Sequence, residues 1–168
     1  CISKDTVIVS GDFQTPQNIS ALGDTFTCVK FPVKIDGNST TPGVTYTWKG
    51  PNGFSSNLQN PDASYKGDYT LILTAPNGCK DTTMATVASD TIKPSVTTVN
   101  DTIECFSFTA TLAANTNAKT PSYSWSGPGI TGTNQTLVVN QAGIYTVTIT
   151  DQSNGCISVG TAQSFDAS

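Results

Sequence analysis

Residues 145–150 read Tyr-Thr-Val-Thr-Ile-Thr, and residues 69–73 read Tyr-Thr-Leu-Ile-Leu. In both segments large apolar side chains recur at every second position, so an extended chain has one apolar face and one face rich in hydroxyls. That alternation is typical of an antiparallel strand buried on one side. Threonine, which is β-branched and suits a pleated surface, occurs 28 times among the 168 residues. The sequence therefore predicts an all-β fold and disfavours a helical bundle.

The two segments belong to an internal repeat. Most matching residues lie 77 positions apart, the Gly-x-Tyr-Thr segments lie 76 apart, and the offset of 77 returns at the second cysteine. The matched pairs include Cys28 and Cys105, Trp48 and Trp125, Gly50 and Gly127, Pro51 and Pro128, Tyr69 and Tyr145, and Cys79 and Cys156. One offset through most of a chain indicates tandem copies of a domain. We expect a first domain at residues 12–89 and a second at residues 90–168.

Residues 1–11 fit the same scheme as the tail of a preceding copy. Cys1 lies 78 positions before Cys79, and Asp12 lies 78 positions before Asp90. An alternative explanation is that Cys1 is the acylated first residue of a mature lipoprotein. Mass spectrometry of the native N-terminus would distinguish the two.

Each copy is expected to hold about seven short strands. Besides the two alternating segments, the predicted strands are residues 25–35, 44–48, 83–88, 103–112, 122–125, 135–139 and 157–162. Asn77-Gly78 and Asn154-Gly155 favour hairpin turns of type I′, because Asn and Gly tolerate positive φ angles. This pattern predicts two tandem β-sandwiches of immunoglobulin-like architecture.

The cysteines are expected to form one disulfide inside each domain. Each complete copy has two cysteines that are 51 residues apart, and the simplest assignment is Cys28 with Cys79 and Cys105 with Cys156. Cys1 would then pair outside the chain. Such bonds need an oxidising compartment. Buried free thiols are the alternative, and zinc is disfavoured because two cysteines without histidine cannot fill a tetrahedral site.

Trp48 and Trp125 lie on predicted central strands, and we expect them in the two cores together with Tyr69 and Tyr145. The alternative for each Trp is an exposed platform on which a sugar stacks.

Composition excludes several classes of function. The chain has 12 acidic residues, 8 basic residues that are all lysine, a net charge of −4 and no histidine. Without imidazole there is no histidine base, no histidine metal ligand and no ordinary catalytic triad. An acidic chain with scattered lysines does not suit nucleic acid, and no apolar run is long enough for membrane insertion. Glu104, the only glutamate, is matched by Thr27 in the first copy, so we expect no enzyme, cofactor or metal.

Three segments carry a family resemblance. Residues 46–54 (Tyr-Thr-Trp-Lys-Gly-Pro-Asn-Gly-Phe), 67–71 (Gly-Asp-Tyr-Thr-Leu) and 77–79 (Asn-Gly-Cys) resemble the tandem immunoglobulin-like repeats, related to polycystic kidney disease domains, of giant Bacteroidetes surface proteins. The gliding-motility adhesin is the best-known example. The resemblance covers both copies and is specific to a repeat type. It implies an extracellular filament on the cell surface, exported by type IX secretion and moved by the gliding machinery.

Two functions from different classes follow. The first is a structural and adhesive stalk module, whose partners are neighbouring repeats of the same chain. The second is a carbohydrate-binding module that holds surface polysaccharide through loops at the sandwich ends. The candidate loop residues are Gly50, Pro51, Asn52, Gly53 and Phe54 in the first copy, and Gly127, Pro128, Gly129, Ile130 and Thr131 in the second. Turns need Gly and Pro in any case, which favours the stalk.

The resemblance also implies O-glycosylation, since those bacteria modify Ser or Thr that follows Asp and precedes a small or aliphatic residue or Thr. The matching positions are Thr6, Thr82, Thr91 and Thr102. A threonine-rich chain also produces such triplets by chance.

Calcium near the ends of the copies is a further possibility. Asp12, Asp90 and Asp166 recur there, with Asp24 and Asp101 in the segments that follow. Calcium takes six to eight oxygen ligands, often from clustered carboxylates. Asp is also a common turn residue, and the chain has no Asp-x-Asp run.

Overall fold

The structure is a computed structural model that describes residues 11–167. These residues form strands β1 to β17 and one short 3-10 turn, η1 (Pro51–Gly53), with no α-helix among them. The predicted all-β fold is confirmed. The predicted domain boundaries remain a prediction.

The described residues group into two compact units. Unit 1 contains the described residues up to Phe26 together with Pro32–Ser89. Unit 2 contains Thr27–Phe31 and the described residues from Asp90 onward. The five residues Thr27–Phe31 thus belong to the first copy by sequence and to unit 2 by contact.

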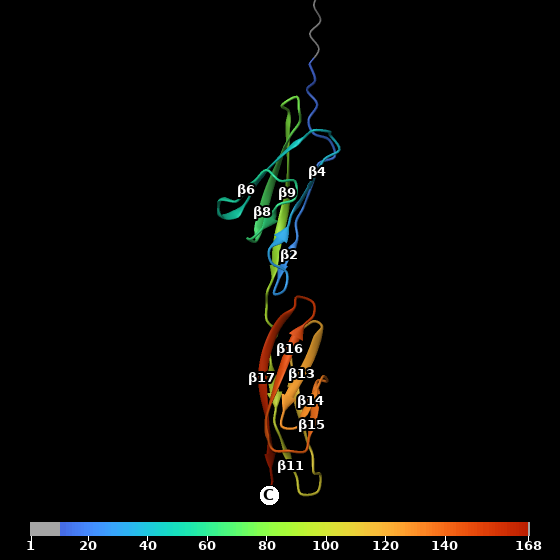
Figure 1. The fold of residues 1–168 in the computed structure, drawn as a ribbon, viewed down its shortest axis with the longest axis vertical. Coiled ribbons are helices and arrows are strands. Elements are labelled where there is room, and N and C mark those ends of the chain that lie inside the picture. Colours follow the sequence, from blue (N-terminus) through green and yellow to red (C-terminus); the bar gives the residue numbers. More distant parts are fainter. Residues whose placement is uncertain (1–10, 168) are drawn as a thin grey trace, which may run out of the picture. The chain divides into compact units, whose positions relative to one another are not determined.

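Unit 1 is built from one larger sheet and two small ones (Figure 1). The larger sheet has the order β2 (Thr25–Thr27), β9 (Lys80–Asp90), β8 (Gly67–Thr74), β5 (Thr45–Lys49) and β6 (Ser55–Ser56). The small sheets pair β1 (Ser20–Leu22) with β4 (Asp36–Asn38), and β3 (Val33–Lys34) with β7 (Asp62–Ala63). Side chains from the larger sheet and from β3 and β7 share one buried apolar cluster. Strands therefore enclose a single core, as in a β-sandwich.

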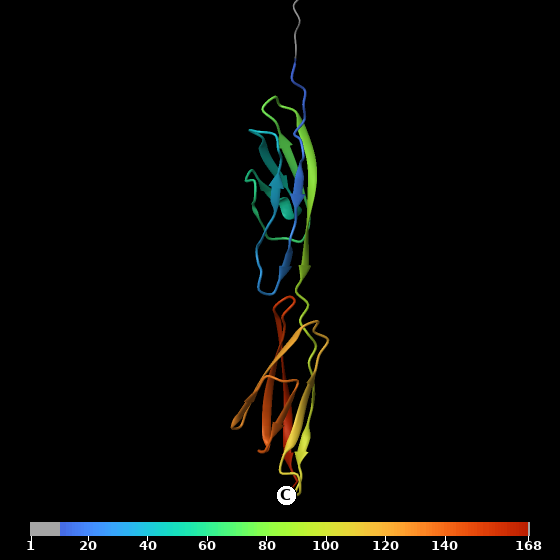
Figure 2. The ribbon, with the colours of Figure 1, turned by 90° about the vertical axis from the view of Figure 1, so that its right-hand side faces the viewer.

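Unit 2 has a five-stranded and a three-stranded sheet. The first has the order β11 (Asp101–Ile103), β17 (Cys156–Asp166), β16 (Gly143–Asp151), β13 (Pro121–Gly127) and β14 (Ile130–Gly132). The second has the order β10 (Thr97–Val99), β12 (Ala110–Asn115) and β15 (Thr136–Val139). The long antiparallel hairpin of β16 and β17, coloured orange to red, is visible from both directions (Figures 1 and 2).

The cores of the two units use matching residues. Tyr69 in β8 and Tyr145 in β16 are completely buried, and alternate residues of both strands are buried with them. The Tyr69 hydroxyl donates to the carbonyl of Tyr65 at 2.8 Å, and the Tyr145 hydroxyl donates to the carbonyl of Gln141 at 2.8 Å. A buried hydroxyl needs such an acceptor, and a bond to the backbone a few residues upstream is the tyrosine corner of immunoglobulin-like domains.

The two predicted strands that contain the first cysteine of each copy are interrupted. Residues 25–35 form β2 and β3 with a loop between them, and residues 103–112 form the end of β11 and the start of β12. The Thr27 hydroxyl accepts the backbone N–H of Lys30 at 3.1 Å and closes the first loop. In the second loop the Glu104 carbonyl accepts the N–H of Ser107 at 3.1 Å. Side-chain and backbone bonds within the loop thus override strand propensity.

The two Asn-Gly turns also differ from the prediction. A type I′ turn needs positive φ at both central residues. Gly78 and Gly155 have φ of 85° and 70°, whereas neither preceding Asn is among the residues with positive φ. The type I′ prediction is therefore wrong, and the Asn side chain has another role.

Candidate functional site

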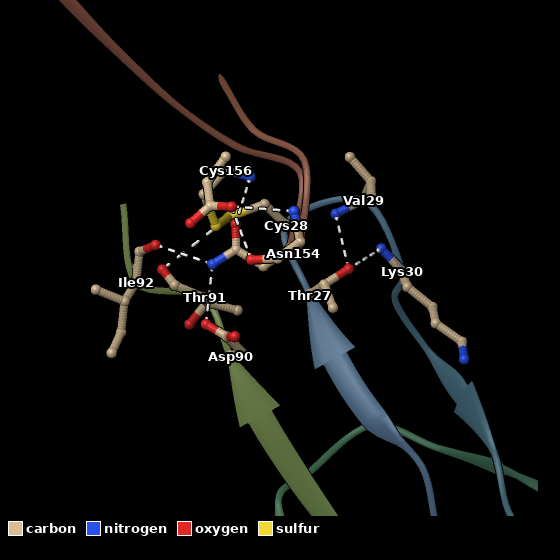
Figure 3. Close-up of a disulfide and its surroundings, with 11 residues drawn as sticks. Thr27, Cys28, Val29, Lys30, Asp90, Thr91, Ile92, Asn154 and Cys156 are labelled. Carbon is tan, nitrogen blue, oxygen red and sulfur yellow. Dashed lines mark hydrogen bonds between the residues drawn. A yellow bond between two sulfur atoms is a disulfide. The ribbon is translucent and has the colours of Figure 1, made fainter. Parts of the chain in front are cut away.

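A disulfide joins Cys28 to Cys156 in unit 2 (Figure 3). Their Cα atoms are 5.0 Å apart, and the residues are separated by 128 positions. The expected bonds from Cys28 to Cys79 and from Cys105 to Cys156 are therefore wrong. Cys79, half-buried, and Cys105, exposed, are free thiols. The disulfide connects residues of two sequence copies rather than two residues of one copy.

Asn154 orients both cysteines of the disulfide. Its backbone carbonyl accepts the N–H of Cys28 at 3.0 Å, and its side-chain oxygen accepts the N–H of Cys156 at 2.9 Å. The second bond closes an Asx turn over Gly155, in which only Gly has positive φ. The Asn side chain therefore closes the turn that the predicted type I′ backbone geometry was expected to close.

The amide nitrogen of Asn154 is also fully used. It donates to a carboxylate oxygen of Asp90 at 2.9 Å and to the carbonyl of Ile92 at 3.1 Å (Figure 3). Asn154 is only 4% exposed, so these bonds satisfy a polar side chain that would otherwise be costly to bury. They fix the turn to residues 90–92 of unit 2.

A buried carboxylate supports the turn from the other strand. Asp151, at the end of β16, accepts hydrogen bonds from the Ser153 hydroxyl at 2.7 Å and from the Lys119 N–H at 3.0 Å. It also accepts the Thr120 hydroxyl at 3.2 Å. These donors, the Ser153 hydroxyl first, hold the pKa of Asp151 far below the ordinary value of 3.8. The carboxylate is therefore ionised and orders the connection that precedes Cys156.

A small cavity in unit 2 borders this network. Its volume is about 180 Å³, and Asp90, Lys119, Asp151 and Asn154 contribute to its lining. The Lys119 ammonium lies 3.7 Å from Asp90. Asp90 also accepts a bond from Asn154, and Asp151 accepts the backbone N–H of Lys119, so these groups of the lining support the turn.

The first candidate ligand loop, residues 50–54, packs on the core tyrosine of unit 1. A Cβ added to Gly50 would collide with the ring of Tyr69. Phe54 makes an edge-to-face contact with the same ring, with centroids 5.0 Å apart. Pro51, Asn52 and Gly53 form η1, in which Asn52 and Gly53 have positive φ. Gly50 and Phe54 therefore have structural roles in this loop.

The hairpin connection that contains the second candidate loop, residues 127–131, is one residue shorter than the one that contains the first. Trp48 pairs with Ser56 across the first loop, whereas Trp125 pairs with Gly132 across the second. This deletion accounts for the change of the repeat offset from 77 to 76 after the loop. Gly127 and Ile130 pair directly, and Pro128 and Gly129 form the turn between them. Thr131, in β14, pairs with Ser126 of β13. A Cβ on Gly127 would collide with Tyr145, as in the first copy.

The two tryptophans are buried. Trp48 is 0% exposed and Trp125 is 1% exposed, so neither offers a platform for a sugar. The indole nitrogen of Trp48 donates to the carbonyl of Gln59 at 3.2 Å, and that of Trp125 donates to Asn134 at 2.9 Å.

The candidate glycosylation residues differ in exposure. Thr82 and Thr91 are exposed, Thr102 is half-buried, and Thr6 lies outside the described residues. Exposure is compatible with modification, which stays a prediction.

The aspartates proposed for calcium are separated or already bonded. Asp101 accepts the N–H groups of Thr102 at 2.8 Å and Thr111 at 2.6 Å, and these bonds lower its pKa. Asp12 accepts the N–H of Gln14 at 3.1 Å. Within residues 11–167, no three His, Cys, Asp or Glu side chains come together as a metal site. No helix among those residues is long and apolar enough to cross a membrane.

No protein-family model and no curated protein sequence matches the chain. Among solved structures it is similar to the three N-terminal domains of the outer capsid protein Hoc of bacteriophage RB49, with 14% identity and a TM-score of 0.53. That match covers 90% of this chain and 59% of the Hoc fragment, so the chain spans less than two thirds of its length. At that level of identity the likeness shows the fold alone.

Two further solved structures are similar at a lower level. The titin I-band fragment I67–I69 has 12% identity and a TM-score of 0.47, covering 89% of this chain and 64% of the fragment. The pair of immunoglobulin domains IG1+IG2 of DIP-gamma has 11% identity and a TM-score of 0.42, and the match covers 90% of this chain and 98% of that pair.

Proposed function

We propose that this chain is a structural and adhesive stalk module of a large repetitive cell-surface protein of a bacterium. The observation that carries the proposal is the bond from Cys28 to Cys156, which links two sequence copies covalently. Such a bond gives a chain of repeats a covalent path besides the backbone, which suits a part that transmits load. Disulfides persist outside the cytoplasm, which agrees with an extracellular location.

The finer parts of the proposal come from the sequence resemblance. We propose that the parent protein belongs to the gliding adhesins of Bacteroidetes, that type IX secretion exports it and that the gliding machinery moves it. Neighbouring repeats are the direct partners.

We also propose that the chain has no catalytic activity. Glu104 is exposed, and its backbone carbonyl closes the loop that holds Cys105. It has no second carboxylate beside it in the sequence that would suggest a pair for acid–base work.

Labelling of intact producing cells tests the stalk. Antibodies raised against the 168-residue chain should bind cells that have not been permeabilised, and an in-frame deletion of one copy should shorten the labelled structure. Label that reaches the chain only after permeabilisation would contradict the proposal.

The carbohydrate-binding alternative is tested separately on a glycan array. Saturable binding that is abolished by Asn52→Ala, an exposed loop position, would favour that alternative. Ser56→Ala, in the adjacent β6, is the matched control.

A further inference from the structure

The two parts of the disulfide site each occur twice in the chain. One part is the cysteine loop, residues 27–31 around Cys28, which recurs as residues 104–108 around Cys105. The other part is the Asn-Gly-Cys turn, residues 154–156, which recurs as residues 77–79. The disulfide joins the loop of the first copy to the turn of the second. One loop and one turn therefore remain with free thiols, Cys105 and Cys79.

The free turn already has the geometry of the bonded one. The N–H of Cys79 donates to the Asn77 side chain at 2.9 Å, the same distance as between Cys156 and Asn154. The Asn77 amide donates to the carbonyl of Gln14 at 2.9 Å, as the Asn154 amide donates to that of Ile92. The Asn77-Gly78-Cys79 turn therefore has this geometry without a disulfide at Cys79. A cysteine loop would bind to a turn that is already formed.

The two turns differ in what covers them. Asn154 and Cys156 are 4% and 0% exposed, whereas Asn77 is exposed and Cys79 is half-buried. A Cβ built on Gly155 would lie 2.6 Å from both methyl groups of Val29, which belongs to the Cys28 loop. A Cβ built on Gly78 has no described atom within 4 Å. What the free turn lacks is a cysteine loop over its glycine.

The free loop is exposed and apolar. Phe106 stands where the bonded loop has Val29, and it is 98% exposed. Phe108 matches Phe31 and is 73% exposed, with a φ of 50° that is strained for an aromatic residue. Two exposed phenylalanines beside an exposed thiol favour contact with another protein surface over contact with water.

We propose that every copy is bonded to the next by the same disulfide, from its cysteine loop to the Asn-Gly-Cys turn of the copy that follows. Cys105 bonds the turn cysteine of a following copy, and Cys79 bonds the loop cysteine of a preceding copy. The inference rests on the proposed function, because it needs further copies on both sides. Phe106 covers the glycine of the turn that its loop meets.

The bond forms by thiol–disulfide exchange. A thiolate attacks a disulfide oxidant, such as glutathione disulfide or an oxidised dithiol protein, and gives a mixed disulfide. This first step releases one thiol of the oxidant. The thiolate of the second cysteine then attacks the sulfur of the first cysteine in the mixed disulfide and releases the other thiol of the oxidant. One S–S bond forms, and the two electrons and two protons from the cysteine thiols reduce the oxidant to two thiols.

Two chains in series test the proposal. In this fusion protein residues 1–165 are followed directly by a second copy of residues 12–168. Asp12 of the second copy then stands in place of its repeat equivalent Asp166. The Cys105 before the junction and the Cys79 after it then lie 128 residues apart, the separation of Cys28 and Cys156. Cys1→Ser removes the one cysteine that lies outside the described residues. The protein is oxidised with glutathione disulfide, alkylated and mapped by peptide mass spectrometry.

The expected result is complete loss of alkylation at the two inner cysteines and a peptide in which they are linked, while the outer Cys79 and Cys105 stay alkylated. Cys105→Ser in the first chain alone should leave the inner Cys79 fully alkylated. The Cys28–Cys156 bond in each chain reports folding and oxidation in the same sample. Inner cysteines that are alkylated or bonded within one copy overturn the proposal, as does failure of Cys28 and Cys156 to pair. The stalk proposal is judged on cells, so either proposal can fail alone.

Discussion

The backbone carbonyl of Asn154 accepts the N–H of Cys28 at 3.0 Å, although the two residues lie in different sequence copies. The Asn154 side-chain oxygen accepts the N–H of Cys156, so one residue positions both ends of the disulfide, one through its backbone and the other through its side chain.

Asn154→Ala should lower the free energy of unfolding by about 2–3 kcal/mol, because buried donors and acceptors lose their partners. Asn77→Ala is the matched control in the other copy. Its bonds are exposed to water, so its loss should be about 1 kcal/mol or less. Urea unfolding of both variants measures the difference. Equal losses would show that the burial of Asn154 does not matter.

Cys28→Ser should be the most destabilising cysteine substitution. Closing a loop of 128 residues constrains the unfolded chain by about 5 kcal/mol on the loop-entropy estimate. Cys105→Ser removes an exposed free thiol and should change stability by no more than about 0.5 kcal/mol. Thermal unfolding with and without reductant measures both. If reductant shifts the melting of wild type and Cys28→Ser equally, the bond has no such role.

The disulfide should also limit how far the chain extends when it is pulled from its ends. The segment from Cys28 to Cys156, a sequence separation of 128, cannot extend while the bond is intact, so reduction should release roughly 440 Å of contour at about 3.4 Å per residue. Single-molecule force spectroscopy measures this release. Cys79→Ser should leave it unchanged. Two separate shorter releases would instead indicate one bond inside each copy.

Stability should fall in acid partly through Asp151. Its pKa is lowered in the folded chain, so its contribution is complete above the ordinary value of 3.8. Below that value the unfolded chain takes up a proton first, and the contribution is lost as the pH falls towards the folded pKa.

Asp151→Asn should therefore be less stable at neutral pH and lose stability less steeply below about pH 4. Asp101 has a lowered pKa as well, through its bonds to Thr111 and Thr102, so part of the slope should remain. Urea unfolding across the acid range measures the slopes. Parallel curves for the two proteins would contradict the role of Asp151.

Gly127→Ala tests whether the second loop is structural. The added methyl group collides with the Tyr145 ring, and overpacking of this kind should cost about 1–3 kcal/mol. Ser126→Ala, on the neighbouring exposed position, should be nearly neutral. Thermal unfolding compares them. A stable Gly127→Ala protein would mean that Gly127 is not required for packing on the tyrosine.

The sequence alone was sufficient to predict the strands in which apolar and polar side chains alternate. Tyr145, Val147 and Ile149 are buried because an extended chain puts them on one face, and that periodicity is local information. The interruption at Thr27 was missed because it depends on a hydroxyl bond to Lys30, which competes with an otherwise good strand sequence.

The cysteine pairing could not be read from spacing. Because every copy has the same spacing, bonds within a copy and bonds from each copy to the next obey the repeat equally well. The second scheme leaves Cys79 of the first copy and Cys105 of the second copy without a partner, whereas pairing within each copy uses all four of these cysteines. What distinguishes the two schemes is that Cys28 lies in a loop rather than on a strand. That loop depends on the bond between Thr27 and Lys30, which the sequence pattern did not predict.

The bond between Cys28 and Cys156 protects the chain against separation by proteolysis. A protease that cuts one peptide link anywhere between these two residues leaves the fragments attached through sulfur. If each copy is fastened to its successor in the same way, these closed loops overlap along the polymer. A single cut within these loops then leaves both parts of the protein connected.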